Sequence, residues 1–313
     1  MKVRAIKLHV DAGRRGRLAD EPFGPAVKAG RPAWSARKMR AMDGDTLLRA
    51  MVASCLAQIL PNADGIARGS RDPEHVHQLR VGLRRLRSAA SGMARFARPL
   101  PAGWQAAIRP AFAALGDARD RHVQSTTLAP RLRQAGAPLA DLGEPSEEEA
   151  KTIQQLVRGA RFHGTMLRLQ AYAERAGDAA DRGRKGSGLA HLTRRLRKLA
   201  RQVTRHVRRF DQLPFARQHE VRKRLKRLRY LAEFAAPAFD KHDVDAWRDK
   251  VARAQRRLGK RIDLALAAER FASQAATQPD ARFAADWLRD KAEASTRAAR
   301  KSLERLRDAK SFW

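Results

Sequence analysis

Residues 72–88 read DPEHVHQLRVGLRRLRS, and this stretch predicts the fold class. Asp72 followed by Pro73 is typical of a helix start, with an N-cap residue and then a proline in the first helical position. Apolar residues then recur three and four positions apart, at Val76, Leu79, Leu83 and Leu86. The stretch therefore predicts an amphipathic helix that packs one face against a core.

The polar residues of this stretch occur a second time in the chain. The pattern H-x-x-R-x-x-x-[RK]-R-L-R begins at His77 and again at His219, an offset of 219 − 77 = 142. A second pattern, L-G-x-x-x-D, begins at Leu115 and again at Leu258, an offset of 258 − 115 = 143. Two patterns at nearly the same offset predict a duplicated structural unit.

The repeated cations share one side of each predicted helix. At about 100° per residue from His77, Arg80, Arg84 and Arg87 lie at roughly 300°, 340° and 280°, beside an apolar stripe centred near 220°. Arg85 lies at roughly 80°, so it is expected to be exposed and to point away from this face. The second copy places four residues in the same way: His219, Arg222, Lys226 and Arg229.

Stacked like charges repel one another unless an anion joins them, so both faces predict anion binding. An ordinary solvated charged face is the alternative. The segment 191–209 supports anion binding, because it carries a third basic stripe three and four positions apart, at Arg194, Lys198, Arg201, Arg205 and Arg208.

The rest of the chain is also predicted to be helical. Pro and Gly clusters divide it into helices over 43–60, 72–98, 103–135, 146–175, 188–211, 215–236, 240–275 and 281–309. Ser146 and Glu149 fit a capping box. The segment Gly177–Gly188 has the composition of a linker. We therefore expect an all-α fold of two four-helix bundles, residues 43–176 and 188–313, after a basic N-terminal extension over residues 1–40.

Composition limits the partners. The 313 residues include 66 Lys and Arg against 33 Asp and Glu, a formal charge of +33 that attracts polyanions. Cys55 is the only cysteine, which excludes an internal disulfide and is expected to be a core thiol. No apolar stretch is long enough to span a bilayer, and the N-terminus lacks a signal peptide, so a cytoplasmic protein without membrane insertion is expected.

These residues resemble the CHAD family, the conserved-histidine α-helical domain. The resemblance covers roughly residues 43–313 and rests on 72–88, 115–120, 221–230 and the ending Lys310-Ser-Phe-Trp313. It implies two pseudo-symmetric four-helix bundles with a basic groove or pore between them. It also implies binding of inorganic polyphosphate and association with polyphosphate granules. The signature residues it carries over are His77, Arg80, Arg84, His219, Arg222 and Lys226. Ile262 departs from the first repeat, which has Arg119.

Catalytic and metal sites have little support in the sequence. Residues 1–32 resemble the tail of a CYTH domain, whose catalytic hallmark is ExExK. Glu147-Glu-Glu-Ala-Lys151 matches those letters, but it lies at a predicted helix start, where acidic residues complement the helix dipole. His75 and His77 are two positions apart and point to different sides of a helix. Asp120 and Asp263 are expected to pair with neighbouring arginines.

No cofactor is expected, and the protein is predicted to be non-catalytic. Nucleic acid is the alternative partner, because its backbone is also a line of phosphates. Aromatic residues make up only 6% of the chain, and only Tyr230 accompanies a basic stripe, whereas single-strand binders stack bases on aromatic side chains. The sequence therefore favours polyphosphate.

Overall fold

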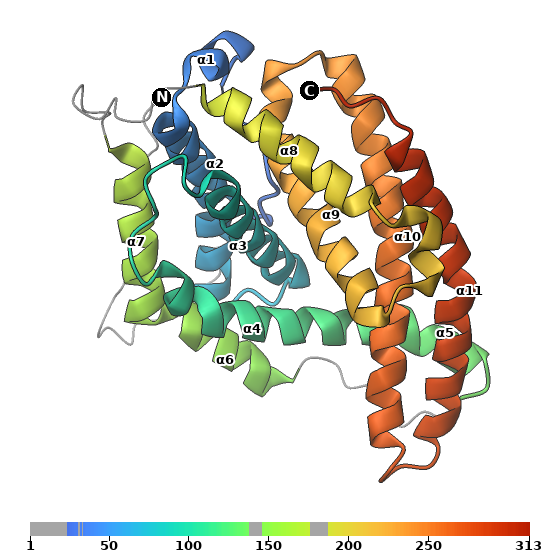
Figure 1. Cartoon of the computed structure of the whole chain (residues 1–313). Coiled ribbons are helices and arrows are strands. Elements are labelled where there is room, and N and C mark those ends of the chain that lie inside the picture. The colour runs from blue at the N-terminus through green and yellow to red at the C-terminus, as the bar shows by residue number, and fades with distance from the viewer. Residues whose placement is uncertain (1–23, 31, 33, 138–145, 176–186) are drawn as a thin grey trace, which may run out of the picture.

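The computed structural model describes residues 24–30, 32, 34–137, 146–175 and 187–313. Most of the N-terminal extension and of the linker Gly177–Gly188 lies outside the described residues. Within the described residues every regular element is a helix, so the all-α prediction is confirmed (Figure 1).

The first half of the chain packs around α2 and α3. Helix α2 (Gly44–Ala67) contacts α3 (Pro73–Met93), α6 (Glu147–Arg158) and α7 (Ala160–Glu174), and α4 (Trp104–Val123) lies across α3, α6 and α7. Asp72 caps α3 by accepting a hydrogen bond from the Glu74 amide, as expected. Ser146 and Glu149 form the expected capping box of α6. Cys55 is buried in the core, as predicted.

The second half consists of helices α8 to α11. Helix α8 (Gly188–Thr204) packs on α9 (Phe215–Ala235), with the 3-10 turn η3 (Val207–Gln212) between them. After a second 3-10 turn, η4 (Ala236–Ala238), helix α10 (Lys241–Gln274) pairs along its length with α11 (Ala281–Arg307). The chain ends against α10, where Phe312 and Trp313 pack edge-on against Trp247.

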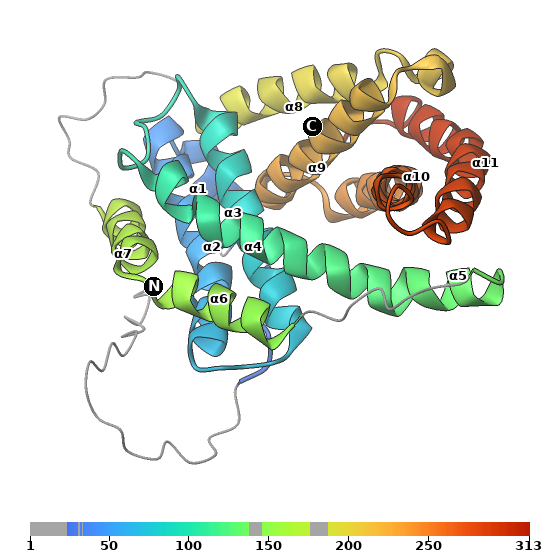
Figure 2. The ribbon, with the colours of Figure 1, turned by 90° about the horizontal axis from the view of Figure 1, so that it is seen from below.

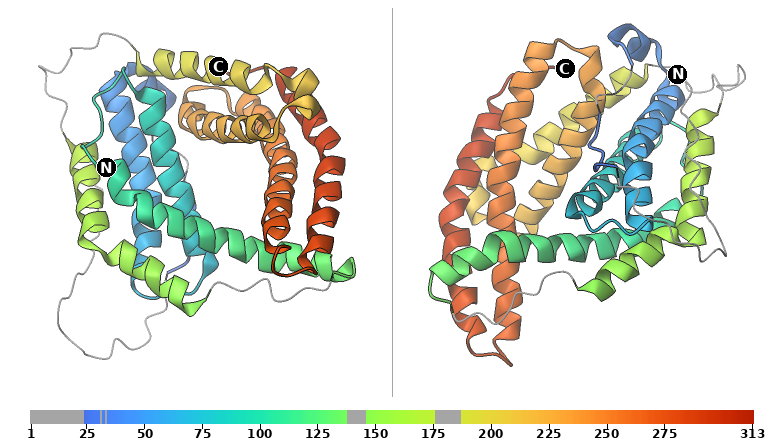
Figure 3. Two further views of the ribbon diagram at one scale, coloured as in Figure 1. Left: turned by 60° about the horizontal axis from the view of Figure 1, so that its bottom comes forward. Right: turned by 180° about the vertical axis from the view of Figure 1, so that it is seen from behind.

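The two halves meet through α3 and α9. Gly92 of α3 lies directly against Leu231 of α9, and a single hydrophobic core continues through both halves. Helix α8 covers one side of α9, and α4 passes on the other side, as Figure 2 and the left view of Figure 3 show. The basic residues of α3 and α9 are therefore brought close to α4.

A second, smaller core lies at the far end of α4. A π-helical turn, η1 (Gln124–Leu128), and α5 (Ala129–Gln134) continue α4 toward the α10–α11 pair. Leu132 packs there with Phe271 and Leu288. This cluster fixes the position of α4 beside the second half of the chain.

Several predicted bounds need correction. The helix predicted from 72 ends at Met93 rather than at 98, and the one predicted from 188 ends at Thr204, before the turn η3. Helix α2 continues through Pro61 to Ala67 rather than ending at 60, since burial of Ile66 offsets the cost of a proline within the helix. The predicted helix 146–175 is two helices, because Gly159 is non-helical. Residues 36–41 of the predicted N-terminal extension form a short helix, α1 (Ala36–Ala41), whose Met39 is fully buried, so this part packs against the helical core.

Candidate functional site

Arg80 of α3 lies against α4. Its guanidinium donates a hydrogen bond of 3.2 Å to the carbonyl of Phe112 and lies 5.0 Å from the centre of the Phe112 ring. A Cβ atom added at Gly116 would overlap this guanidinium. The glycine of the first L-G-x-x-x-D pattern therefore makes room for the arginine of the first basic pattern.

Lys226 of α9 lies among cations from both repeats. Its pKa is lowered to about 7, first by burial and then by the charges of Arg222, Arg84 and Arg80, against which Asp263 acts in the opposite direction. Arg222 and Lys226 come from the second repeat, whereas Arg80 and Arg84 come from the first. These four side chains form one basic cluster, which is the name used for them below.

Two members of the basic cluster form no ion pair with a described residue. Arg222 forms an ion pair of 2.8 Å with Asp263 of α10, the kind of pairing expected for that carboxylate. Arg84 and Lys226 have no ion pair or side-chain hydrogen bond with another residue of the described chain. Two half-buried cations therefore face each other across the two repeats.

The repeated histidines flank the basic cluster. Burial lowers the pKa of His77, and the charge of Arg119 adds to this effect. Burial also lowers the pKa of His219, followed by Lys223 and Arg222. The His219 ring meets the edge of Phe215, with 6.2 Å between ring centroids. Both imidazoles are thus biased toward the neutral form while no anion is present.

The other predicted site residues are more exposed. Arg87 is exposed, and its guanidinium lies 5.1 Å from the centre of the Phe112 ring. Arg229 pairs with Glu233 at 3.4 Å, so part of its charge is already neutralised. Arg194, Lys198, Arg201 and Arg205 are exposed on α8, which lies across α9 from α4. The structure does not bring these four to the basic cluster.

The predicted exposure of Arg85 is wrong, because its side chain is only 1% exposed. It donates a hydrogen bond of 2.9 Å to Gln58 and lies 3.9 Å from the carboxylate of Glu233. The predicted apolar stripe of α3 did not include the glycines of this helix. Small residues such as Gly82 and Gly92 allow α2 and α9 to cover this side of α3 as well.

Sequence reasoning also missed some neighbours of the basic cluster. Arg119 of α4 acts on His77, and its position within the first L-G-x-x-x-D pattern was the available signal. Its equivalent Ile262 is fully buried, so the two repeats differ there. Tyr230 is buried, and the Arg229 guanidinium lies 4.9 Å from the centre of its ring, so it does accompany a basic stripe as expected. Phe112 is a further aromatic neighbour, in contact with Arg80 and Arg87, and Phe215 lies beside His219.

The ExExK match at 147–151 and the pair His75 and His77, which the sequence analysis did not take as catalytic or metal sites, have structural contacts of their own. Glu147 pairs with Arg71 at 2.9 Å and Glu149 pairs with Arg121 at 2.5 Å, beside its role in the capping box. His75 is buried against Gly65. His75 and His77 therefore lie on different sides of α3, as the spacing predicted.

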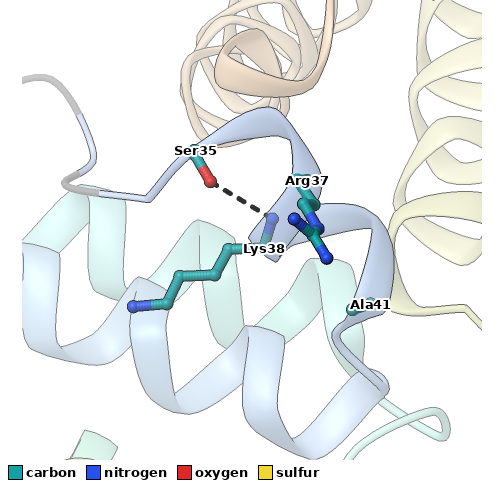
Figure 4. Close-up of a pocket in the computed structure, with 4 residues that line it drawn as sticks. All are labelled: Ser35, Arg37, Lys38 and Ala41. Atoms are coloured by element: carbon teal, nitrogen blue, oxygen red, sulfur yellow. Dashed lines mark hydrogen bonds between the residues drawn. The ribbon is translucent and has the colours of Figure 1, made fainter.

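Two hollows lie away from the basic cluster. One of about 490 Å³ lies at α1 and is lined by Ser35, Arg37, Lys38 and Ala41, with Arg37 and Lys38 pointing to different sides (Figure 4). The other, of about 870 Å³, follows α10 and α11 and reaches Phe215 and Arg261. Among the helices of the described chain, none has both the length and the apolar character needed to cross a bilayer.

Comparison with known proteins agrees with this architecture. The family model of the CHAD domain matches residues 50–272. The chain belongs to the CHAD family. A crystal structure of the CHAD domain from the plant Ricinus communis matches with a TM-score of 0.72 and 25% sequence identity, over 90% of this chain and 97% of that chain. A comparison with curated proteins gave no match. The CHAD match includes both basic patterns and both L-G-x-x-x-D patterns.

Proposed function

We propose that this CHAD protein binds inorganic polyphosphate through the basic cluster and does not act on it chemically. One observation carries this proposal: Arg84 and Lys226, from different repeats, are close enough for their charges to interact, and neither forms an ion pair within the described chain. Two half-buried like charges destabilise each other until an anion lies between them. A chain of phosphates supplies that anion and has room for many further contacts.

The surroundings of the basic cluster favour polyphosphate over nucleic acid. Single-stranded nucleic acids need aromatic faces on which bases stack. The Phe112 ring is instead in contact with two arginines, Arg80 and Arg87, and Tyr230 is buried. Such a site recognises phosphate oxygens and offers bases little contact.

A non-catalytic role follows from the same contacts. The Asp263 carboxylate close to the basic cluster forms an ion pair with Arg222 rather than standing free as a general base. Binding without turnover suits a protein that is carried to polyphosphate granules by its affinity for the polymer. We therefore propose granule association as the cellular consequence.

The test is a titration at physiological salt with long-chain polyphosphate, duplex DNA and single-stranded RNA as separate ligands. Polyphosphate is expected to bind most tightly. Arg84→Glu and Lys226→Glu are each expected to weaken it by more than tenfold, because each removes a charge-assisted hydrogen bond and adds a repulsion. Arg297→Glu, on the exposed surface of α11, is the control and should change affinity little.

Two outcomes would contradict the proposal. Nucleic acid that binds at least as tightly and loses affinity in the same variants would make the cluster a nucleic-acid site. Release of phosphate from polyphosphate with Mg²⁺, abolished by Lys151→Ala, would make the protein an enzyme.

A further inference from the structure

The outer face of α8 is a second concentration of positive charge. Four exposed cations follow one another at spacings of four, three and four residues: Arg194, Lys198, Arg201 and Arg205, called the α8 stripe below. At about 1.5 Å per residue they extend over roughly 16 Å of the helix. The chain from His191 to Arg209 contains no Asp or Glu that could neutralise them.

The α8 stripe is also without partners from other elements. None of its four side chains has an ion pair or hydrogen bond with another residue of the described chain. On α11, by contrast, Arg289 pairs with Asp286 at 2.5 Å and Arg300 pairs with Asp211 at 3.5 Å. An unneutralised line of cations gains most from a linear polyanion, because binding releases the counterions of the polymer.

The α8 stripe and the basic cluster face different sides of the molecule. The buried residues of α8 lie roughly 180° around the helix from the stripe: Leu192, Leu196, Leu199 and Val203. These residues pack toward α9, so the stripe points away from α9. The basic cluster lies where α9 and α3 meet α4, on the other side of α9 (Figures 2 and 3).

The contact between α8 and α9 supports this separation. Arg195 of α8 is close enough to Arg227 of α9 for their charges to interact. Arg227 lies about 100° around α9 from Lys226, because it is the next residue along the helix. The α8–α9 contact therefore lies on a different face of α9 from Lys226.

We infer that the α8 stripe is a second polyphosphate-binding surface, so that one protein holds two chain segments and cross-links polyphosphate. This inference rests on the proposed function of the basic cluster. The two surfaces face apart, so a short chain occupies one of them only. A long chain reaches both surfaces or joins neighbouring protein molecules. By cross-linking, the protein joins polyphosphate chains into larger assemblies instead of only binding to existing ones.

The experiment compares three variants with the wild-type protein. The stripe variant is Arg194→Gln/Lys198→Gln/Arg201→Gln/Arg205→Gln, and the cluster variant is Arg84→Gln/Lys226→Gln. The control removes the same charge as the stripe variant from exposed positions of α11, by Arg282→Gln/Arg297→Gln/Lys301→Gln/Arg305→Gln. Calorimetry with short polyphosphate chains gives the number of chains bound, and light scattering with long chains reports cross-linking.

Wild type and control are each expected to bind two short chains per protein. With long chains they are expected to scatter light when protein and polyphosphate are present in comparable amounts. Excess polyphosphate should abolish this scattering, because each chain then finds few proteins to share. The stripe variant is expected to bind one chain and to remain clear. The cluster variant is also expected to bind one chain, held by α8.

Two results would overturn the inference while polyphosphate binding itself stands. In the first, the stripe variant matches the control in stoichiometry and in scattering. In the second, the stripe variant loses affinity for duplex DNA only, which makes α8 a nucleic-acid surface. A wild-type protein that binds no polyphosphate at all would instead refute the proposed function, and the inference with it.

Discussion

Gly116 and Gly259 hold equivalent positions in the two repeats but have different neighbours. Gly116 lies directly against the Arg80 guanidinium, whereas the nearest atom to a Cβ at Gly259 would be a carboxylate oxygen of Asp263 at 3.9 Å. The pair therefore provides a test of how Arg80 is positioned, with a control built into the chain.

Gly116→Ala is expected to displace Arg80 and weaken polyphosphate binding by roughly tenfold, because one charge-assisted hydrogen bond is lost. The fold should survive, since a flexible side-chain end is able to move. Gly259→Ala is expected to bind as wild type does. Both are checked by titration and circular dichroism, and equal affinities for the two variants would show that Arg80 does not contact the ligand.

Lys226 is the residue whose charge changes near neutral pH. Its pKa of about 7 in the free protein is set by burial and by Arg222, Arg84 and Arg80, against the opposing effect of Asp263. Bound phosphate raises that pKa, so the complex holds a proton that the free protein releases above pH 7. The lowered pKa values of His77 and His219 change in the same direction on binding.

Polyphosphate affinity is therefore expected to rise as pH falls through about 7 and to level off once Lys226 is protonated in the free protein. Lys226→Arg should flatten this part of the profile, because arginine stays charged. Titrations between about pH 6 and pH 8.5 provide the measurement, because this range includes the Lys226 pKa of about 7. A Lys226→Arg profile identical to that of wild type would assign the proton to another group.

At the scale of helices, Arg85 joins α3 to α2 and α9. Its buried guanidinium bonds to Gln58, lies 3.9 Å from the Glu233 carboxylate and packs 4.9 Å from the centre of the Phe234 ring. Arg227 holds the equivalent position in α9 but is only half-buried. The same sequence pattern thus places one arginine in the core and the other near the surface.

Arg85→Met is expected to lower the free energy of unfolding by about 2–3 kcal/mol, since it leaves buried polar groups without a partner. Arg227→Met, the matched control, should change stability by less than about 1 kcal/mol, as surface substitutions generally do. Urea unfolding followed by circular dichroism measures both. Similar losses in the two variants would mean that Arg85 does not hold the helices together.

The sequence predicted much of these helices but misjudged their surroundings. Helix starts at Asp72 and Ser146 were predictable, because capping depends on residues a few positions apart. The burial of Arg85 was not, because it depends on which helices cover α3 through small residues such as Gly82 and Gly92. Helical periodicity describes one helix and contains no information on how many neighbours surround it.

At the scale of the whole molecule, both copies of the repeated sequence pattern contribute to the basic cluster. Each repeat contributes cations from one helix, and the packing of α3 on α9 brings Arg84 close to Lys226. The repeat offset predicted that the two faces belong together, but the sequence grouped the α8 residues with them. Only the packing of α8 on the far side of α9 shows that its stripe faces elsewhere.

The most direct test of a site shared by the two repeats is the salt dependence of polyphosphate affinity in two charge-matched variants. Arg84→Gln/Lys226→Gln removes one cation from each repeat, and Arg297→Gln/Lys301→Gln removes two exposed cations of α11. The first variant is predicted to lose about a hundredfold in affinity and about two in the slope of log affinity against log salt. The second is predicted to keep the wild-type affinity and slope. Equal losses in the two variants would show that net charge, rather than the basic cluster, binds the polymer.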